Sequence, residues 1–357
     1  MSGIRQPWLG VAASAAVTVF ALLAMLPLSY ATLGGVVADV MMCAIPFTAV
    51  VGSFWQGRQP RAIAELRQPL RGLAFLGLAA VVAVAVYWCL QATIGGGQGA
   101  TPVLAFGIIV SVVVTFVLVV VWGGWPFTLI PNPLLGGAAL LVAAYLVTGL
   151  LVQALDFSFL GGAFPGLDPS GPLPAWDGLV GAVTCLATVF AFLHLDLWPF
   201  RRSPALLRQP VLGLVWTPAV LALGCGLYYA GTRWLGLSPD TFLVSVPVPF
   251  MFGTVILLTM LEGSATARLR GLRRGFASLA LAAVLGTLLA RCFVLLQPLL
   301  TPDVPANSLD QHLWLASALL AVTFPLLAMH HDFFGFWPLR TTSVPEREVE
   351  VAAPAGR

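Results

Sequence analysis

Apolar residues are gathered into ten long stretches that are separated by short polar segments. The stretches cover residues 8–31, 34–55, 70–93, 102–124, 134–155, 177–198, 211–233, 241–262, 275–299 and 312–335. A helix of about 20 apolar residues crosses the hydrocarbon core of a membrane, and each stretch reaches that length. Several stretches contain proline or glycine, which membrane helices tolerate when their neighbours satisfy the backbone. The pattern therefore predicts ten transmembrane helices.

A short phrase marks the start of every second stretch. It consists of an amide residue, proline, two variable residues and glycine, and it occurs at residues 6–10, 68–72, 132–136 and 209–213. A degenerate fifth copy at residues 271–275 keeps only the final glycine. Proline suits the first turn of a helix, the preceding Gln or Asn can accept bonds from first-turn amides, and the glycine permits close helix packing. The phrase therefore predicts the start of a packed helix.

A second phrase, built on tryptophan and proline, lies where most of the intervening stretches end. It occurs at Trp55 and at residues 125–127, 198–200 and 337–339. Tryptophan is typical of the membrane–water interface, and proline is typical of helix ends. Two stretches separate successive copies of the first phrase, so the repeated unit is a helical hairpin. The five hairpins cover about residues 6–60, 68–127, 132–200, 209–263 and 271–339.

These units predict an all-α integral membrane protein with ten transmembrane helices built as five parallel helical-hairpin repeats. We expect a single domain at residues 1–340, followed by a short disordered tail at residues 341–357. The repeats are parallel because each one begins and returns on the same side of the membrane. Five hairpins in one chain resemble the architecture of the tellurite-resistance and slow-anion-channel family, which arranges ten helices around a pore with a phenylalanine gate. The resemblance concerns architecture alone, and no residue is carried over from it.

Composition and charge indicate the environment and the orientation. Hydrophobic residues make up 59% of the chain, charged residues make up 9%, and the mean hydropathy is +0.96, a balance that excludes a soluble domain. The chain has no lysine, and its arginines gather before the first stretch, in the loops after the second, sixth and eighth stretches, and after the last one. Positive residues near helix ends stay cytoplasmic, so we expect an inner-membrane protein with both termini in the cytoplasm. The net charge of +3 reflects this topology and predicts no nucleic-acid partner.

Phenylalanines recur near mid-membrane on the even-numbered stretches. They are Phe47, Phe116, Phe190, Phe250 and Phe324. Prolines stand beside three of them, so the helices are expected to break there. A ring of phenylalanines at helix breaks can form a hydrophobic constriction that gates a pore by dewetting. Ordinary apolar packing beside kinks is the alternative interpretation.

A candidate metal site lies near the cytoplasmic ends of three even-numbered stretches. Its members are His194, Asp196, Glu262, His330, His331 and Asp332. Imidazole and carboxylate together suit zinc, iron, manganese or copper, and paired histidines suit haem. Residues two apart on a helix point about 200° from each other, so His194 and Asp196 cannot both face one site without distortion. A proton-coupling cluster, or interfacial groups that pair with arginines and helix dipoles, are the alternatives.

Two further charges fall inside the predicted membrane region. Asp39 lies about 5 residues into its stretch from outside, and Arg291 lies about 16 residues into its stretch from inside. At 1.5 Å per residue both come out at a similar depth, roughly a quarter of the way in from the outer face. A closed ring of hairpins would bring the first unit beside the fifth. We therefore predict an ion pair between them, or a solute pathway that uses Arg291.

The leading functional hypothesis is an inner-membrane channel or transporter for a small solute or ion. A small anion, weak acid or gas-like solute is favoured because few polar residues lie at mid-membrane. The alternative is a membrane-embedded metal or haem protein, either an enzyme or an anchor subunit of a redox complex. The expected partners are membrane lipids, the solute itself, and either other membrane subunits or further copies of the chain.

Overall fold

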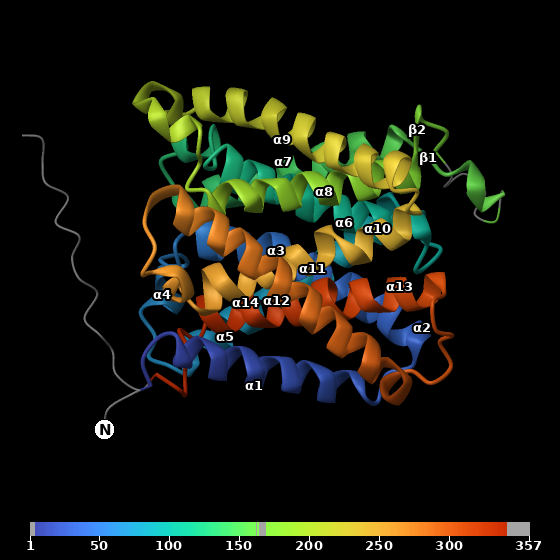
Figure 1. The fold of residues 1–357 in the computed structure, drawn as a ribbon, viewed down its shortest axis with the longest axis horizontal. Helices are drawn as coiled ribbons and strands as arrows, with labels where there is room; N and C mark the ends of the chain where they lie inside the picture. Colours follow the sequence, from blue (N-terminus) through green and yellow to red (C-terminus); the bar gives the residue numbers. More distant parts are fainter. Residues whose placement is uncertain (1–3, 162, 164–168, 341–357) are drawn as a thin grey trace, which may run out of the picture.

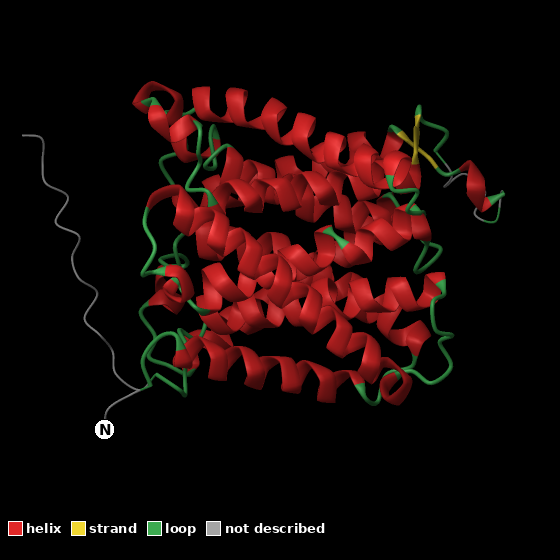
Figure 2. Ribbon diagram, viewed as in Figure 1, coloured by secondary structure: helices red, strands yellow, loops and turns green. Residues whose placement is uncertain are grey.

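The computed structural model describes residues 4–161, 163 and 169–340, and most of these are helical (Figures 1 and 2). Ten helices are long and apolar enough to cross a membrane, which confirms the ten predicted helices. We number them as spans 1 to 10. The predicted disordered tail at residues 341–357 lies outside the described residues.

Each odd-numbered span is formed by one long helix, extended in span 7 by a π-helical turn. These helices are α1 (Trp8–Met25), α5 (Leu70–Thr93), α7 (Pro133–Gln153), α9 (Val211–Tyr229) with η8 (Ala230–Trp234), and α12 (Gly271–Leu300).

The even-numbered spans are segmented, with the exception of span 6. Span 2 consists of α2 (Tyr30–Thr32), η1 (Leu33–Val37), α3 (Ala38–Ala49) and η2 (Val50–Phe54), and span 4 consists of α6 (Pro102–Phe116) and η3 (Val117–Val121). Span 6 is α8 (Ala175–His194), span 8 consists of α10 (Pro239–Ser245), α11 (Pro247–Thr254) and η9 (Val255–Met260), and span 10 consists of α13 (Leu309–Ala316), η11 (Ser317–Thr323) and α14 (Phe324–Asp332).

Short elements connect the spans at the two ends of the bundle. They are α4 (Arg61–Ala64), η4 (Phe127–Leu129), η5 (Ser158–Leu160), η6 (Phe200–Arg202), η7 (Pro204–Leu207), η10 (Ser264–Thr266), and the two-residue strands β1 (Leu155–Asp156) and β2 (Leu173–Pro174), which pair in parallel. We call the end that carries α4 and the clustered arginines the arginine-rich end. It lies at the left of Figure 1, whereas β1 and β2 lie at the right.

Even-numbered spans form the interior of the bundle, and odd-numbered spans surround them. In the most apolar part of each span, 61–72% of residues are buried in the even spans, against 22–33% in the odd spans. Each even span contacts the next one along the chain, and span 10 contacts span 2, so the inner helices close into a ring. Each odd span packs against the even span that precedes it, and span 1 packs against span 10.

The first phrase builds the contacts between the two layers at the arginine-rich end. In its three glutamine copies the side-chain oxygen accepts a hydrogen bond from the amide of the phrase glycine, as at Gln6 and Gly10 (3.1 Å). The side-chain NH₂ donates to the final carbonyls of an even span: Gln6 to Met260, Gln68 to Phe333 and Gln209 to Val121. One glutamine side chain thus bonds a backbone N–H at the start of an odd span and a backbone carbonyl at the end of an even span. Backbone groups at helix ends lack partners within their own helix.

All five even spans end in the same backbone conformation. Two consecutive residues with left-handed φ follow each helix: Gln56–Gly57, Gly123–Gly124, Asp196–Leu197, Glu262–Gly263 and Gly335–Phe336. In three of them the second residue donates its N–H to the carbonyl six residues back, at 2.8–2.9 Å. Such turns satisfy the last carbonyls of a helix and stop it abruptly.

Glycines of the odd spans rest directly on these ends. A Cβ on Gly10 would lie 2.2 Å from the Met260 carbonyl oxygen of span 8, and one on Gly275 would lie 2.9 Å from the His194 carbonyl oxygen of span 6. At the starts of spans 3, 5 and 7 the glycine packs against an aromatic ring instead of a backbone carbonyl. Gly72 meets Phe334 after span 10, Gly137 meets Trp55 after span 2, and Gly213 meets Trp122 after span 4.

Candidate functional site

A cavity of about 280 Å³ lies on the axis of the inner ring at its arginine-rich end, and we call it the vestibule. All five even spans contribute to its wall. Its polar lining residues are Thr48, Ser53, Thr254, Thr259, His331 and Asp332. Spans 4 and 6 add Val120 and Leu193, one residue before the ends of their helices, so the C-terminal ends of all five inner spans lie around the vestibule.

Three phenylalanines narrow the axis beyond the vestibule. Phe116 contacts Phe190 and Phe324 edge-on, with ring centroids 5.6 and 6.3 Å apart. These three rings and Ile45 line both the vestibule and a second cavity on the far side. They therefore form a hydrophobic constriction between two spaces.

The second cavity, the inner chamber, is small and has an apolar lining. It has a volume of about 40 Å³ and is again lined by all five even spans. Its other residues are Met42, Ile109, Val112, Val113, Val183, Leu186, Met251 and Leu320. A water molecule needs about 10–15 Å³ measured in this way, so the chamber has room for one very small solute.

Three of the five phenylalanines predicted to form a ring lie at the axis, and the other two lie away from it. Phe116, Phe190 and Phe324 lie at the constriction, but Phe47 and Phe250 do not line the axial cavities. Phe47 packs edge-on against Trp55, with ring centroids 6.1 Å apart. Phe250 lies beside His194 and lines a lateral groove of about 450 Å³ among spans 6 to 9.

His194 is buried between helices and both of its ring nitrogens are engaged. Nδ1 lies 2.7 Å from the Ser278 hydroxyl of span 9, and Nε2 lies 3.0 Å from the Thr254 hydroxyl of span 8. One nitrogen donates and the other accepts, whichever tautomer is present. This residue therefore ties spans 6, 8 and 9 together beside the vestibule.

The other members of the predicted metal cluster lie apart from His194. Asp196 pairs with Arg201 at the surface, because the left-handed turn after span 6 carries it away from the helix. Glu262 lies 3.8 Å from Arg340, also near the surface. Among residues 4–161, 163 and 169–340, no three His, Cys, Asp or Glu side chains are grouped so as to hold a metal ion. The predicted cluster is not assembled.

The histidines of span 10 face different surroundings. His331 Nδ1 lies 2.7 Å from Asp332 Oδ1, and both residues line the vestibule. The ring of His330 packs against the rings of Phe334 and Phe336, with centroids 6.4 and 6.0 Å away. Adjacent residues on a helix point about 100° apart, so the two imidazoles do not converge.

An entrance cavity of about 320 Å³ adjoins the vestibule at the arginine-rich end. The two cavities share Gly52, His331 and Asp332, and the entrance is also lined by Gln56, Gln68 and Arg71. Gly52 makes room for the Asp332 carboxylate, since a Cβ at this position would lie 2.4 Å from Oδ2. Sequence analysis listed Asp332 but missed Gly52, which carries no chemical group to attract attention.

Asp39 and Arg291 do not form the predicted ion pair. Asp39 is buried on α3, whereas Arg291 is exposed on the outer surface of α12. No salt bridge within the described ranges involves either residue. The ring closes instead where span 10 contacts spans 1 and 2.

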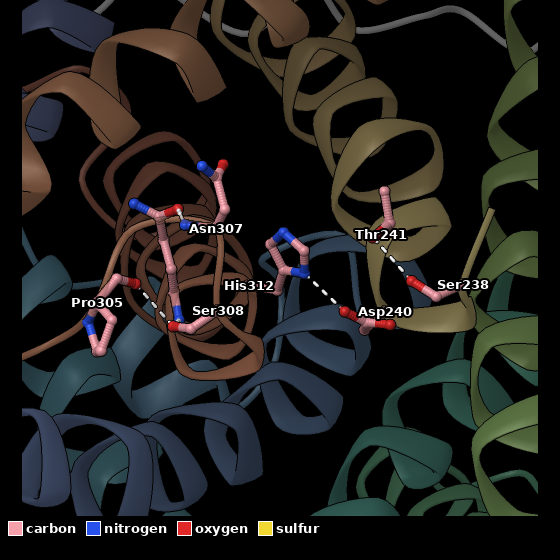
Figure 3. A network of polar contacts seen from close by, with 8 residues as sticks. Ser238, Asp240, Thr241, Pro305, Asn307, Ser308 and His312 are labelled. Atoms are coloured by element: carbon pink, nitrogen blue, oxygen red, sulfur yellow. Dashed lines mark hydrogen bonds and ion pairs between the residues drawn. The ribbon is translucent and has the colours of Figure 1, made fainter.

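Polar ties join the starts of the inner spans at the opposite end of the bundle. Figure 3 shows His312 of span 10 pointing at Asp240 of span 8, with Nδ1 and Oδ2 2.7 Å apart. Asp310 accepts a hydrogen bond from Tyr30 at the start of span 2 (3.1 Å). Span 10 is thus held to both of its neighbours in the ring.

Comparison of the chain with protein-family models, curated proteins and solved structures gives no match.

Proposed function

We propose that the protein is a channel or transporter that moves a small solute along the axis of its inner ring. The observation that carries this proposal is the series of entrance cavity, vestibule, phenylalanine constriction and inner chamber, in which the vestibule and the inner chamber are each lined by all five even spans. Hydrophobic constrictions between wider spaces are a common gating device in membrane channels.

We further propose that the ten spans are five hairpin repeats. The contacts of glycines near the starts of the odd spans (Gly10, Gly72, Gly137, Gly213 and Gly275) support this, because they follow one rule. Spans 1, 3, 5, 7 and 9 meet the ends of spans 8, 10, 2, 4 and 6, a constant step of three hairpins around a ring of five. The five matching helix ends support it as well. A shared rule of this kind is expected when copies are related by rotation about one axis.

The orientation that we propose places the vestibule at the cytoplasmic surface of the inner membrane. The loops at that end carry the clustered arginines, and positive residues near helix ends remain cytoplasmic. The first described residues and the end of span 10 lie there too, which is consistent with both termini in the cytoplasm.

The lining of the route favours an uncharged solute while it crosses the constriction. No arginine lines the vestibule or the inner chamber in the described part of the chain. The C-termini of the five inner helices and Asp332 make the vestibule negative, so it disfavours anions. Of the solutes suggested by the sequence, a gas-like molecule or the neutral form of an ionisable one fits best.

Flux through proteoliposomes tests the proposal. Purified protein is reconstituted with an internal pH dye, and the uptake of acetate and methylammonium salts is compared with uptake in protein-free liposomes. Wild-type protein should accelerate at least one of them, Phe190→Trp should slow it and Phe190→Ala should hasten it. Phe192→Ala is the matched control, because Phe192 packs against Trp216 away from the axis. The proposal fails if no solute is accelerated, or if both positions respond alike.

A further inference from the structure

Asp332 lies at the point where a solute passes from the entrance cavity to the vestibule. It is the last residue of α14, and its side chain is 24% exposed and lines both cavities. Oδ1 is engaged by His331 Nδ1 at 2.7 Å. Oδ2 accepts no hydrogen bond from the residues that the structure describes. It lies against Gly52 at the boundary between the entrance cavity and the vestibule, which we call the neck. One carboxylate oxygen is therefore free to bind a solute.

The surroundings of Asp332 add to its attraction for positive charge. The C-termini of the inner helices end around the vestibule, and each carries a partial negative charge. Hydroxyls of Thr48, Ser53, Thr254 and Thr259 line the wall and can accept hydrogen bonds. Ends of interrupted helices serve in this way as cation sites in membrane transporters.

Arg71 is the positive group on the wall of the entrance cavity. Its Nη2 donates to the Gly57 carbonyl at 3.1 Å, at the end of span 2, and it forms no salt bridge with Asp332 within 4 Å. Arg71 does not line the vestibule. The attraction for cations is therefore strongest on the vestibule side of the neck.

We propose that Asp332 forms a capture site for a small ammonium-type cation. The cation is a protonated amine that is small enough to pass through the inner chamber. This inference rests on the proposed transport function and names its substrate class. A cation that carries a removable proton fits both halves of the route. It binds as R–NH₃⁺ at Oδ2, releases one proton to the cytoplasmic water, and passes the phenylalanines as neutral R–NH₂. A metal cation cannot lose its charge, and the apolar inner chamber excludes it.

Binding is measured on purified protein in detergent with methylammonium chloride as the probe. A ligand that binds only the folded state raises the midpoint of thermal unfolding, which tryptophan fluorescence follows. Wild-type protein should show a saturable rise, and Asp332→Asn should weaken binding about 10-fold or more, since Asn keeps the shape of the side chain but removes the charge that strengthens its hydrogen bond to the ammonium group. Glu262→Gln is the control, because this carboxylate lies outside both cavities, and it should bind like wild type.

Gly52→Ala provides a test that keeps the carboxylate. The new Cβ displaces Oδ2, so binding of methylammonium should weaken even where Asp332→Asn does not fold. The proposal is overturned if wild type shows no saturable rise of the unfolding midpoint with methylammonium chloride, or if Gly52→Ala and Asp332→Asn bind methylammonium like wild type. It is also overturned if sodium chloride raises the unfolding midpoint of wild type as much as methylammonium chloride does.

Measurements of solute flux in proteoliposomes distinguish a failure of the capture site from a failure of the proposed transport function. If methylammonium binds at Asp332 but no solute crosses proteoliposomes faster than through lipid alone, the capture site stands and the transport proposal fails. If methylamine flux responds to Phe190 substitutions but not to Asp332→Asn, transport stands and the capture site fails.

Discussion

Replacing Gly286 by alanine should destabilise the bundle where spans 8 and 9 cross closely. A Cβ on Gly286 would lie 1.8 Å from the Pro249 carbonyl oxygen, and one on Gly253 would lie 2.0 Å from the Ala282 carbonyl oxygen. Both obstacles are backbone atoms, so no side chain can turn aside and spans 8 and 9 must separate. Overpacking of this kind costs about 1–3 kcal/mol or more, which exceeds the gain of up to about 1 kcal/mol from replacing glycine in a helix.

Gly226→Ala is the matched control for this substitution. Gly226 lies within α9, and a Cβ there would have no neighbour within 4 Å, so alanine should be neutral or slightly stabilising. The two variants make the same chemical change within a helix, so the gain from replacing glycine cancels and their free energies of unfolding should differ by the overpacking cost of roughly 1–3 kcal/mol or more. Titration with SDS in mixed micelles, followed by circular dichroism, measures this difference. Equal stability of the two variants would refute the close crossing of spans 8 and 9.

Three further predictions test contacts at other places in the bundle. Gln68→Leu removes the bonds to Phe333 and Gly72 and should lower the free energy of unfolding by about 1–3 kcal/mol, whereas exposed Gln98→Leu should not. In a double-mutant cycle, His312→Ala and Asp240→Asn should show a coupling of about 0.5–1 kcal/mol, and purely additive effects would exclude their pairing. Arg291→Gln should change stability by less than about 0.5 kcal/mol, and a larger loss would indicate a partner.

Hydropathy and the short phrases predicted the helices well because both depend on local chemistry. The stretch at 134–155 became Pro133–Gln153, and the prolines of span 8 coincide with a break at Val246, where the backbone leaves the helical region. Asn132 accepts bonds from the amides of the first turn, as its place before proline predicted. These features need only the residue and its immediate neighbours along the chain.

The candidate sites were harder to predict because depth in a membrane can be estimated from sequence but rotation about a helix axis cannot. Asp39 and Arg291 have similar estimated depths, yet one is buried and the other is exposed on an outer helix. Asp196 left its helix in a left-handed turn that hydropathy does not indicate. Phe47 and Phe116 occupy similar positions along their spans but lie in different packing clusters.

Covalent blockage of the vestibule tests most directly whether solute follows the axis. Ser53 lines the vestibule and is exposed, whereas Ala205 is exposed on η7 and lines neither axial cavity. In a variant without the five native cysteines, Ser53→Cys and Ala205→Cys are each modified with a bulky, membrane-impermeant thiol reagent, and solute flux in proteoliposomes is measured. Modification of Ser53→Cys should abolish flux and that of Ala205→Cys should leave it unchanged. Full modification of Ser53→Cys with undiminished flux would contradict an axial route.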